Sequence, residues 1–101
     1  MNTINLGGKA FTADDINPDA MTREQLIDLW NMTNTGRARL GKFLFPDRPK
    51  GYVRAARDIG LYAMNKATAM KLRKEGDIPE AQKYEAICDD IYKALPGFAR
   101  W

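Results

Sequence analysis

The sequence predicts an all-α protein: a three- to four-helix bundle built on an αα-hairpin, with a short extended or β-hairpin arm at its N-terminus. Apolar residues recur at helical spacing, a glycine turn divides the second half of the chain, and a Gly-Gly pair near the start separates two short segments. With 101 residues, the chain is long enough for one domain and too short for two. We expect an arm and acidic loop over residues 1–20 and a helical domain over 21–101.

The arm is predicted from Gly7-Gly8, which lies between two short alternating segments and is a hairpin signal. A two-stranded hairpin alone is marginal in water. We therefore favour an arm ordered against the helices. Pairing with another chain, which would make a homo-oligomer through the arm, and mobility are the alternatives. Residues 12–20 carry three aspartates and Asn17-Pro18, a composition typical of a loop.

The first long helix is predicted to open at Thr22, with Gln25 completing a capping box. Trp30 continues the apolar stripe of this helix and is expected in the core. The tetrad 33–36, Thr-Asn-Thr-Gly, is a weak point at which the helix either breaks or kinks. We favour a break, with a second short helix over 36–45 that ends at Pro46.

The αα-hairpin is predicted over residues 52–95. Its first helix covers about 52–75 and ends at Gly76, which suits a left-handed C-cap. Asp77 is expected to cap the second helix, with Glu80 completing a capping box. Pro79 lies in the first turn of this helix, and Pro96 follows its end. The expected core draws on every helix: Leu26, Trp30, Leu40, Leu44, Ile59, Ala63, Met70, Tyr84, Cys88, Ile91 and Leu95.

The turn of this hairpin resembles that of a tetratricopeptide-type repeat. In the segment from Leu72 to Glu85, the family's turn glycine, small packing residue and aromatic residue fall on Gly76, Ala81 and Tyr84. The resemblance covers one turn and part of two helices. It departs upstream, where Asn65 and Thr68 stand in place of an aromatic residue and a leucine, and the chain holds no second copy. It implies an αα-hairpin and does not extend to peptide binding.

The charge is unevenly distributed along the chain. Residues 37–74 hold eleven Lys and Arg against two acids, a net charge of +9, whereas residues 1–36 and 75–101 each carry −3. Such a block must face water or a polyanion, because unpaired charge is costly to bury. The predicted contact residues for nucleic acid or for a partner protein are Arg37, Arg39, Lys42, Arg48, Lys50, Arg54 and Arg57. Three aromatic residues interleaved with them, Phe43, Phe45 and Tyr52, suit stacking on unpaired bases if they are exposed.

The first functional hypothesis is therefore a small accessory protein without enzymatic activity that binds DNA or RNA through this basic block. The second is an inhibitor or adaptor that docks on an acidic surface of another protein. The short, helical, motif-poor chain is similar in style to accessory proteins of phages and mobile elements. A basic block that is simply solvated, or paired with the acids of its own chain, is the plainest reading of the same pattern.

An enzyme, a cofactor and a metal site are not expected. The chain has no histidine and one cysteine, so it lacks imidazole triads, disulfide frameworks and Cys/His zinc sites. Cys88 falls on the apolar stripe of the last helix and is expected to be a buried hydrophobe rather than a reactive thiol. No stretch has the pattern of a membrane span or signal peptide, so a cytoplasmic protein is the default expectation.

Overall fold

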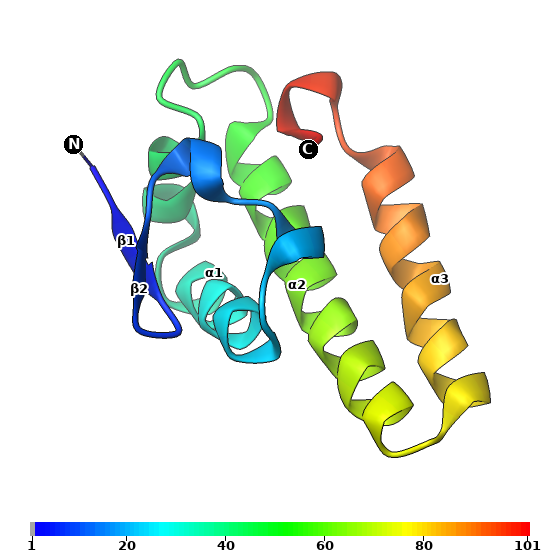
Figure 1. Ribbon diagram of the computed structural model, residues 1–101. Coiled ribbons are helices and arrows are strands. Elements are labelled where there is room, and N and C mark those ends of the chain that lie inside the picture. The colour runs from blue at the N-terminus through cyan, green and yellow to red at the C-terminus, as the bar shows by residue number, and fades with distance from the viewer. Residues whose placement is uncertain (1) are drawn as a thin grey trace.

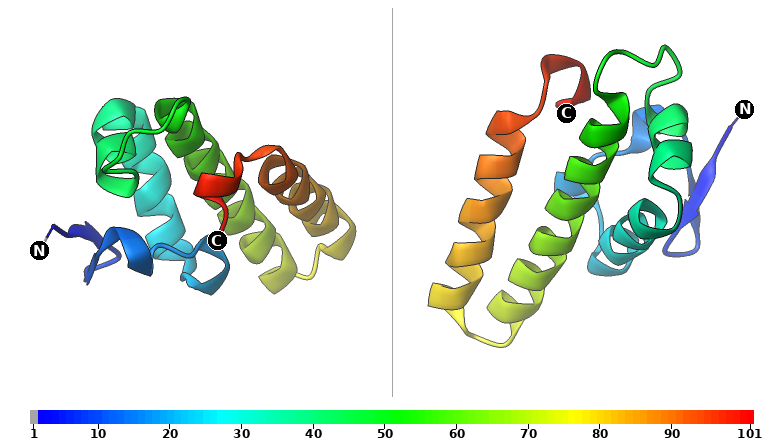
Figure 2. Two further views of the ribbon diagram at one scale, coloured as in Figure 1. Left: turned by 90° about the horizontal axis from the view of Figure 1, so that it is seen from above. Right: turned by 180° about the vertical axis from the view of Figure 1, so that it is seen from behind.

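Three long helices, joined by short connections, form the frame of the fold (Figure 1). The computed structural model describes residues 2–101. The elements in chain order are β1 (Ile4–Leu6), β2 (Lys9–Phe11), η1 (Ala13–Asp15), η2 (Pro18–Ala20), α1 (Arg23–Leu44), α2 (Tyr52–Lys74), α3 (Ile78–Ala94) and η3 (Gly97–Ala99). Seen from above, α2 lies between α1 and α3 (Figure 2). The predicted fold class, a helical bundle with a β-hairpin arm, is confirmed.

The α2–α3 hairpin forms where its local signals predict it. Gly76 has a left-handed φ of 85° and its N–H donates to the Arg73 carbonyl at 3.1 Å, which closes α2. The Asp77 side chain then accepts from the Glu80 N–H and starts α3. The Asp77 N–H donates to the Leu72 carbonyl, so it satisfies the end of α2 rather than completing a capping box with Glu80.

The predicted break in the first helix is also confirmed. Gly36 has φ −168° and ψ 63°, so helical geometry stops there and resumes up to Leu44. The start of α1 is held by the reciprocal capping box of Thr22 and Gln25. The break turns the second segment of α1 relative to the first (Figure 1). That second segment carries the first three residues of the predicted basic site.

The arm is ordered and packs on α1. Gly7 and Gly8, with φ 57° and 80°, make the turn between two antiparallel strands that pair in the register Ile4 with Phe11. Leu6 and Phe11 are buried in the common core. The Gly7 N–H donates to Asp28 Oδ2 at 2.6 Å and fixes the turn to α1. The arm's apolar side chains are therefore used within its own chain.

Five of the eleven predicted core residues are not fully buried. Trp30 is only half-buried, because the inward positions of α1 are taken by Leu26, Leu29 and Thr33. Met70 is exposed, because Ala69 faces the core at that level of α2. Leu44, Tyr84 and Ile91 are half-buried, and the remaining predicted core residues are buried, Cys88 included. No helix within residues 2–101 is long and apolar enough to cross a bilayer.

Candidate nucleic-acid interface

One end of the molecule is built from the last turns of α1, the loop 45–51 and the first turn of α2 (Figure 1). Gly41 allows this close approach, since a Cβ built there would lie 3.0 Å from the Tyr52 ring. The Arg48 N–H donates to the Phe45 carbonyl at 2.9 Å, and the Tyr52 N–H donates to the Pro49 carbonyl at 3.0 Å. The loop is therefore a hydrogen-bonded turn, and it holds the two helix ends side by side.

Six of the seven predicted contact residues come from this end, and we call them the basic end. Its members are Arg37, Arg39, Lys42, Arg48, Lys50 and Arg54. All six side chains are exposed. None forms an ion pair within 4.0 Å with a carboxylate of residues 2–101. Between residues 37 and 54 the only acid is Asp47, so this segment carries a net charge of +5.

Arg57, the seventh predicted contact residue, is placed differently. Its guanidinium donates to Asp58 Oδ1 through Nε at 3.1 Å and through Nη2 at 2.8 Å. Farther along α2, Lys66 pairs with Asp19 at 3.1 Å and Arg73 pairs with Glu85 at 2.5 Å. Acids from the two flanking parts of the chain thus pair with Lys66 and Arg73, whereas none of the six cations of the basic end is paired with a carboxylate of residues 2–101.

The three interleaved aromatic residues are half-buried rather than freely displayed. Phe43 packs against the core, and the Tyr52 ring covers Gly41. Phe45 meets Phe98 of the C-terminal tail edge-on, with ring centroids 5.1 Å apart at an angle of 88°. Phe98 is 41% exposed, so its ring is the one next to the basic end that is accessible to a ligand. Apart from the presence of an aromatic residue near the C-terminus, no sequence pattern predicts this pairing.

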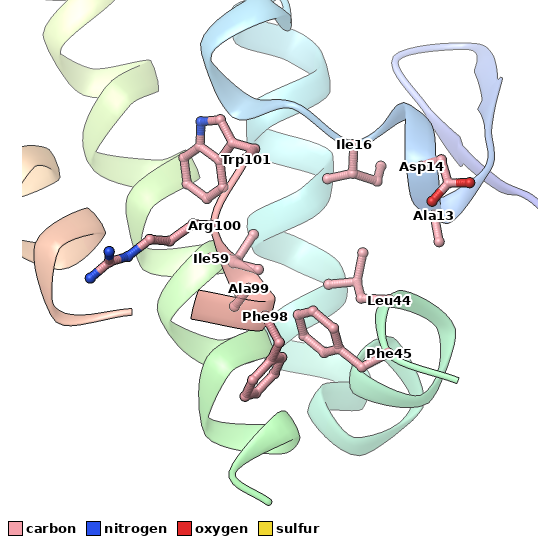
Figure 3. A pocket seen from close by; sticks show the side chains of 10 residues that line it. All are labelled: Ala13, Asp14, Ile16, Leu44, Phe45, Ile59, Phe98, Ala99, Arg100 and Trp101. Atoms are coloured by element: carbon pink, nitrogen blue, oxygen red, sulfur yellow. The ribbon is translucent and has the colours of Figure 1, made fainter. Parts of the chain in front are cut away.

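A hollow of about 260 Å³ lies beside these two rings, between the C-terminal tail, α1 and α2 (Figure 3). Leu44, Phe45, Ile59 and Phe98 supply its apolar wall. The side chain of Arg100 turns away from it in Figure 3, and its guanidinium donates to the backbone carbonyls of residues 93 and 95.

A separate polar cluster centres on Asp19 and holds the C-terminal tail. Its carboxylate accepts from the Tyr62 hydroxyl at 2.5 Å and from Trp101 Nε1 at 2.7 Å, and it pairs with Lys66. Burial works to raise the pKa of Asp19, but the hydrogen bonds from these three side chains outweigh it and hold the pKa below its ordinary value. Burial, followed by the bond to Asp19, raises the pKa of Tyr62 well above its usual range. Because the carboxylate is fully engaged, we assign this cluster a structural role.

Residues 2–101 hold no group of three or more Asp, Glu or Cys side chains placed to bind a metal ion. Burial raises the pKa of the Cys88 thiol to about 11, which disfavours the nucleophilic thiolate. No family model, curated protein or solved structure matches this chain.

Proposed function

We propose that the protein is a small accessory protein, without enzymatic activity, that binds the phosphate backbone of nucleic acid through the basic end. The observation that carries the proposal is the set of six exposed cations of the basic end, none of which is paired with a carboxylate of residues 2–101. Lys66 and Arg73 of the same chain form ion pairs with Asp19 and Glu85. The cations of the basic end form no such pair with residues 2–101, so their charge is left for a ligand. A cytoplasmic site of action goes with this proposal, because nucleic acid is accessible there.

The chemistry of the cations also supports a phosphate ligand. Four of the six are arginines, whose planar guanidinium groups bind phosphate oxygens in a bidentate manner. Phosphate contacts of this kind position a protein on nucleic acid without reading its sequence. The expected binding is therefore weakly sequence-specific and driven by the release of counterions.

Two lysine pairs test the proposal with matched chemistry. Lys42→Gln/Lys50→Gln removes two charges from the basic end, whereas Lys71→Gln/Lys74→Gln removes two from the opposite end of α2. All four lysines are exposed. Fluorescence anisotropy with labelled oligonucleotides should show a clear loss of affinity for the first variant and little change for the second. Equal losses in both variants would falsify binding through the basic end.

A second candidate function, docking on an acidic surface of a partner protein, is favoured by an apolar hollow away from the basic end. This hollow, of about 230 Å³, is lined by Ile27, Trp30 and Met64 among others, and Met64 is 43% exposed. A phage-type inhibitor or adaptor would use the basic end for attraction and such apolar side chains for contact. A pull-down from extract distinguishes the two functions. A partner protein that remains bound after nuclease treatment supports docking, and loss of all partners counts against it.

A further inference from the structure

We propose that the hollow beside Phe45 and Phe98 receives an unpaired base of a single-stranded nucleic acid whose phosphates lie on the basic end. This inference rests on the proposed function and narrows its substrate class from nucleic acid in general to single strands. It depends on an exposed aromatic ring beside a hollow of limited size (Figure 3) and on the exposed cations of the neighbouring loop and helix ends.

The two phenyl rings offer a stacking surface. They meet at 88° with centroids 5.1 Å apart, so at least one face of each ring is left uncovered by the other. Phe98 is 41% exposed and lies on the rim of the hollow. Its position is fixed, because Ala99 next to it is buried in the core. A base that stacks on Phe98 would therefore meet a pre-placed ring.

The hollow has the size and chemistry expected for one planar group. Its volume of about 260 Å³ falls below the roughly 300–1,000 Å³ of pockets that enclose drug-sized ligands. Leu44, Ile59 and the two phenylalanines give it an apolar wall, and Asp14 is the carboxylate on its lining. Such a surface accepts any base by its π-face, which agrees with weakly sequence-specific binding.

The residues that line the hollow and the cations of the basic end are neighbours along the backbone. The N–H of Arg48 donates to the carbonyl of Phe45, so the loop that carries Arg48 and Lys50 turns over the residue that lines the hollow. Lys42 lies three residues before Phe45, on the last turn of α1. A strand that lays its phosphates on these cations passes the rim formed by Phe98.

The preference for single-stranded nucleic acid follows from the position of the bases in a duplex. In a double helix the bases are paired and stacked inside, so only phosphates and groove edges reach a protein surface. Unpaired bases can turn outward and stack on aromatic side chains. A duplex would use the basic end alone, whereas a single strand would use both the cations and the ring.

The experiment compares Phe98→Leu, which keeps an apolar side chain but removes the ring, with Ile87→Leu, a control at another exposed apolar position. The probes are labelled oligothymidylate and oligouridylate of about 12 nucleotides, and a hairpin duplex with the same number of phosphates. Phe98→Leu should weaken binding of the single strands by about 5- to 100-fold and leave duplex binding unchanged. The two single-stranded probes distinguish DNA from RNA. Ile87→Leu should change none of these affinities.

The outcomes separate this inference from the proposed function. If Phe98→Leu binds the single strands as tightly as wild type, or weakens single strands and duplex equally, base insertion is overturned. The phosphate interface still stands in that case, provided that Lys42→Gln/Lys50→Gln weakens all the probes. If that lysine variant changes no affinity, the proposed function fails and the base site fails with it.

Discussion

Gly60 lets the backbone of α2 lie directly against Thr33 of α1. A Cβ built on Gly60 would stand 2.1 Å from Thr33 Oγ1, far inside contact distance. Thr33 cannot easily move away, since it is 2% exposed and its hydroxyl donates to the Leu29 carbonyl at 3.1 Å. The packing of the two helices at this level therefore requires the absence of a side chain.

Gly60→Ala should lower the free energy of unfolding by about 1–3 kcal/mol, because the added methyl group overpacks a buried contact. This cost exceeds the gain of about 1 kcal/mol in helix propensity that alanine brings. Urea unfolding followed by circular dichroism measures it. Gly97→Ala is the matched control, since a Cβ there meets open space. Equal unfolding midpoints for the two variants would contradict the packing argument.

Asp19 gives the fold a specific dependence on pH. Its pKa lies below the ordinary value of 3.8 in the folded state, through the hydrogen bonds from Tyr62, Trp101 and Lys66 that outweigh burial. A depressed carboxyl pKa contributes stability that is present above the unfolded pKa and lost as the pH falls through the folded pKa.

Asp19→Asn should therefore destabilise the protein most above about pH 5, and its difference from wild type should shrink as the pH drops below about 4. Urea midpoints measured across this range test the expectation. Asp90→Asn, an exposed aspartate on α3 without an ion pair to the described residues, is the control. A difference between Asp19→Asn and wild type that does not vary with pH would show that charge on this carboxylate is unimportant.

At the scale of elements, α3 depends on the tail that follows it. The helix itself buries only Ala81 and Cys88, and both are small. Trp101 adds to this contact, with its ring centroid 4.8 Å from that of Tyr92 on α3 and 4.7 Å from that of Tyr62 on α2. The last residue of the sequence thus bridges the two helices of the hairpin.

Trp101→Ala should selectively loosen α3. The loss of stability should stay below the roughly 3–5 kcal/mol of a fully buried tryptophan, because Trp101 is half-buried. Hydrogen exchange should show reduced protection across α3, with the α1–α2 contact retained. Trp30→Ala, at the other tryptophan on α1, should leave the relative protection of α3 unaltered. A uniform loss of protection in the Trp101 variant would exclude the bridging role.

The helix boundaries were predictable because their signals are local. Thr22, Gly36, Gly76 and Asp77 each act on backbone groups within a few residues. The core was less predictable. Apolar periodicity identifies the apolar stripe of a helix, but it does not show how much of that stripe a neighbouring helix buries. For this reason Trp30 was wrongly predicted to lie in the core.

At the scale of the whole molecule, charge is separated along the structure. The basic end is free of ion pairs to residues 2–101, while Lys66 and Arg73 farther along α2 are neutralised by Asp19 and Glu85 from the two acidic parts of the chain. A polyanion is therefore attracted to one end and oriented by the protein's own field.

The salt dependence of binding should report this separation. Six phosphate contacts correspond to a slope of log affinity against log salt of about −4 to −5, so affinity should fall about 10³-fold between roughly 50 and 200 mM salt. Anisotropy titrations at several salt concentrations provide the slope. Arg54→Gln should reduce its magnitude by somewhat less than one. A slope near zero would rule out the basic end as a phosphate surface.

The candidate site was predictable only where it is continuous in sequence. Residues 37–54 supply its cations, and their excess over acids is visible without a structure. The involvement of Phe98 was not predictable, because its contact with Phe45 joins segments more than fifty residues apart. The engagement of Arg57 by Asp58 depends on a rotamer, which sequence alone does not define.

Cys88, the single cysteine of the sequence, allows the local separation of α2 from α3 to be measured. Cys88 is 4% exposed and its Sγ lies 3.6 Å from the Tyr62 carbonyl oxygen. Its thiolate can attack an alkylating reagent, and displace the leaving group, only after α2 and α3 separate locally and the thiol ionises. The rate at which Cys88 of the wild-type protein is labelled therefore reports how often the two helices separate, and no engineered probe is needed.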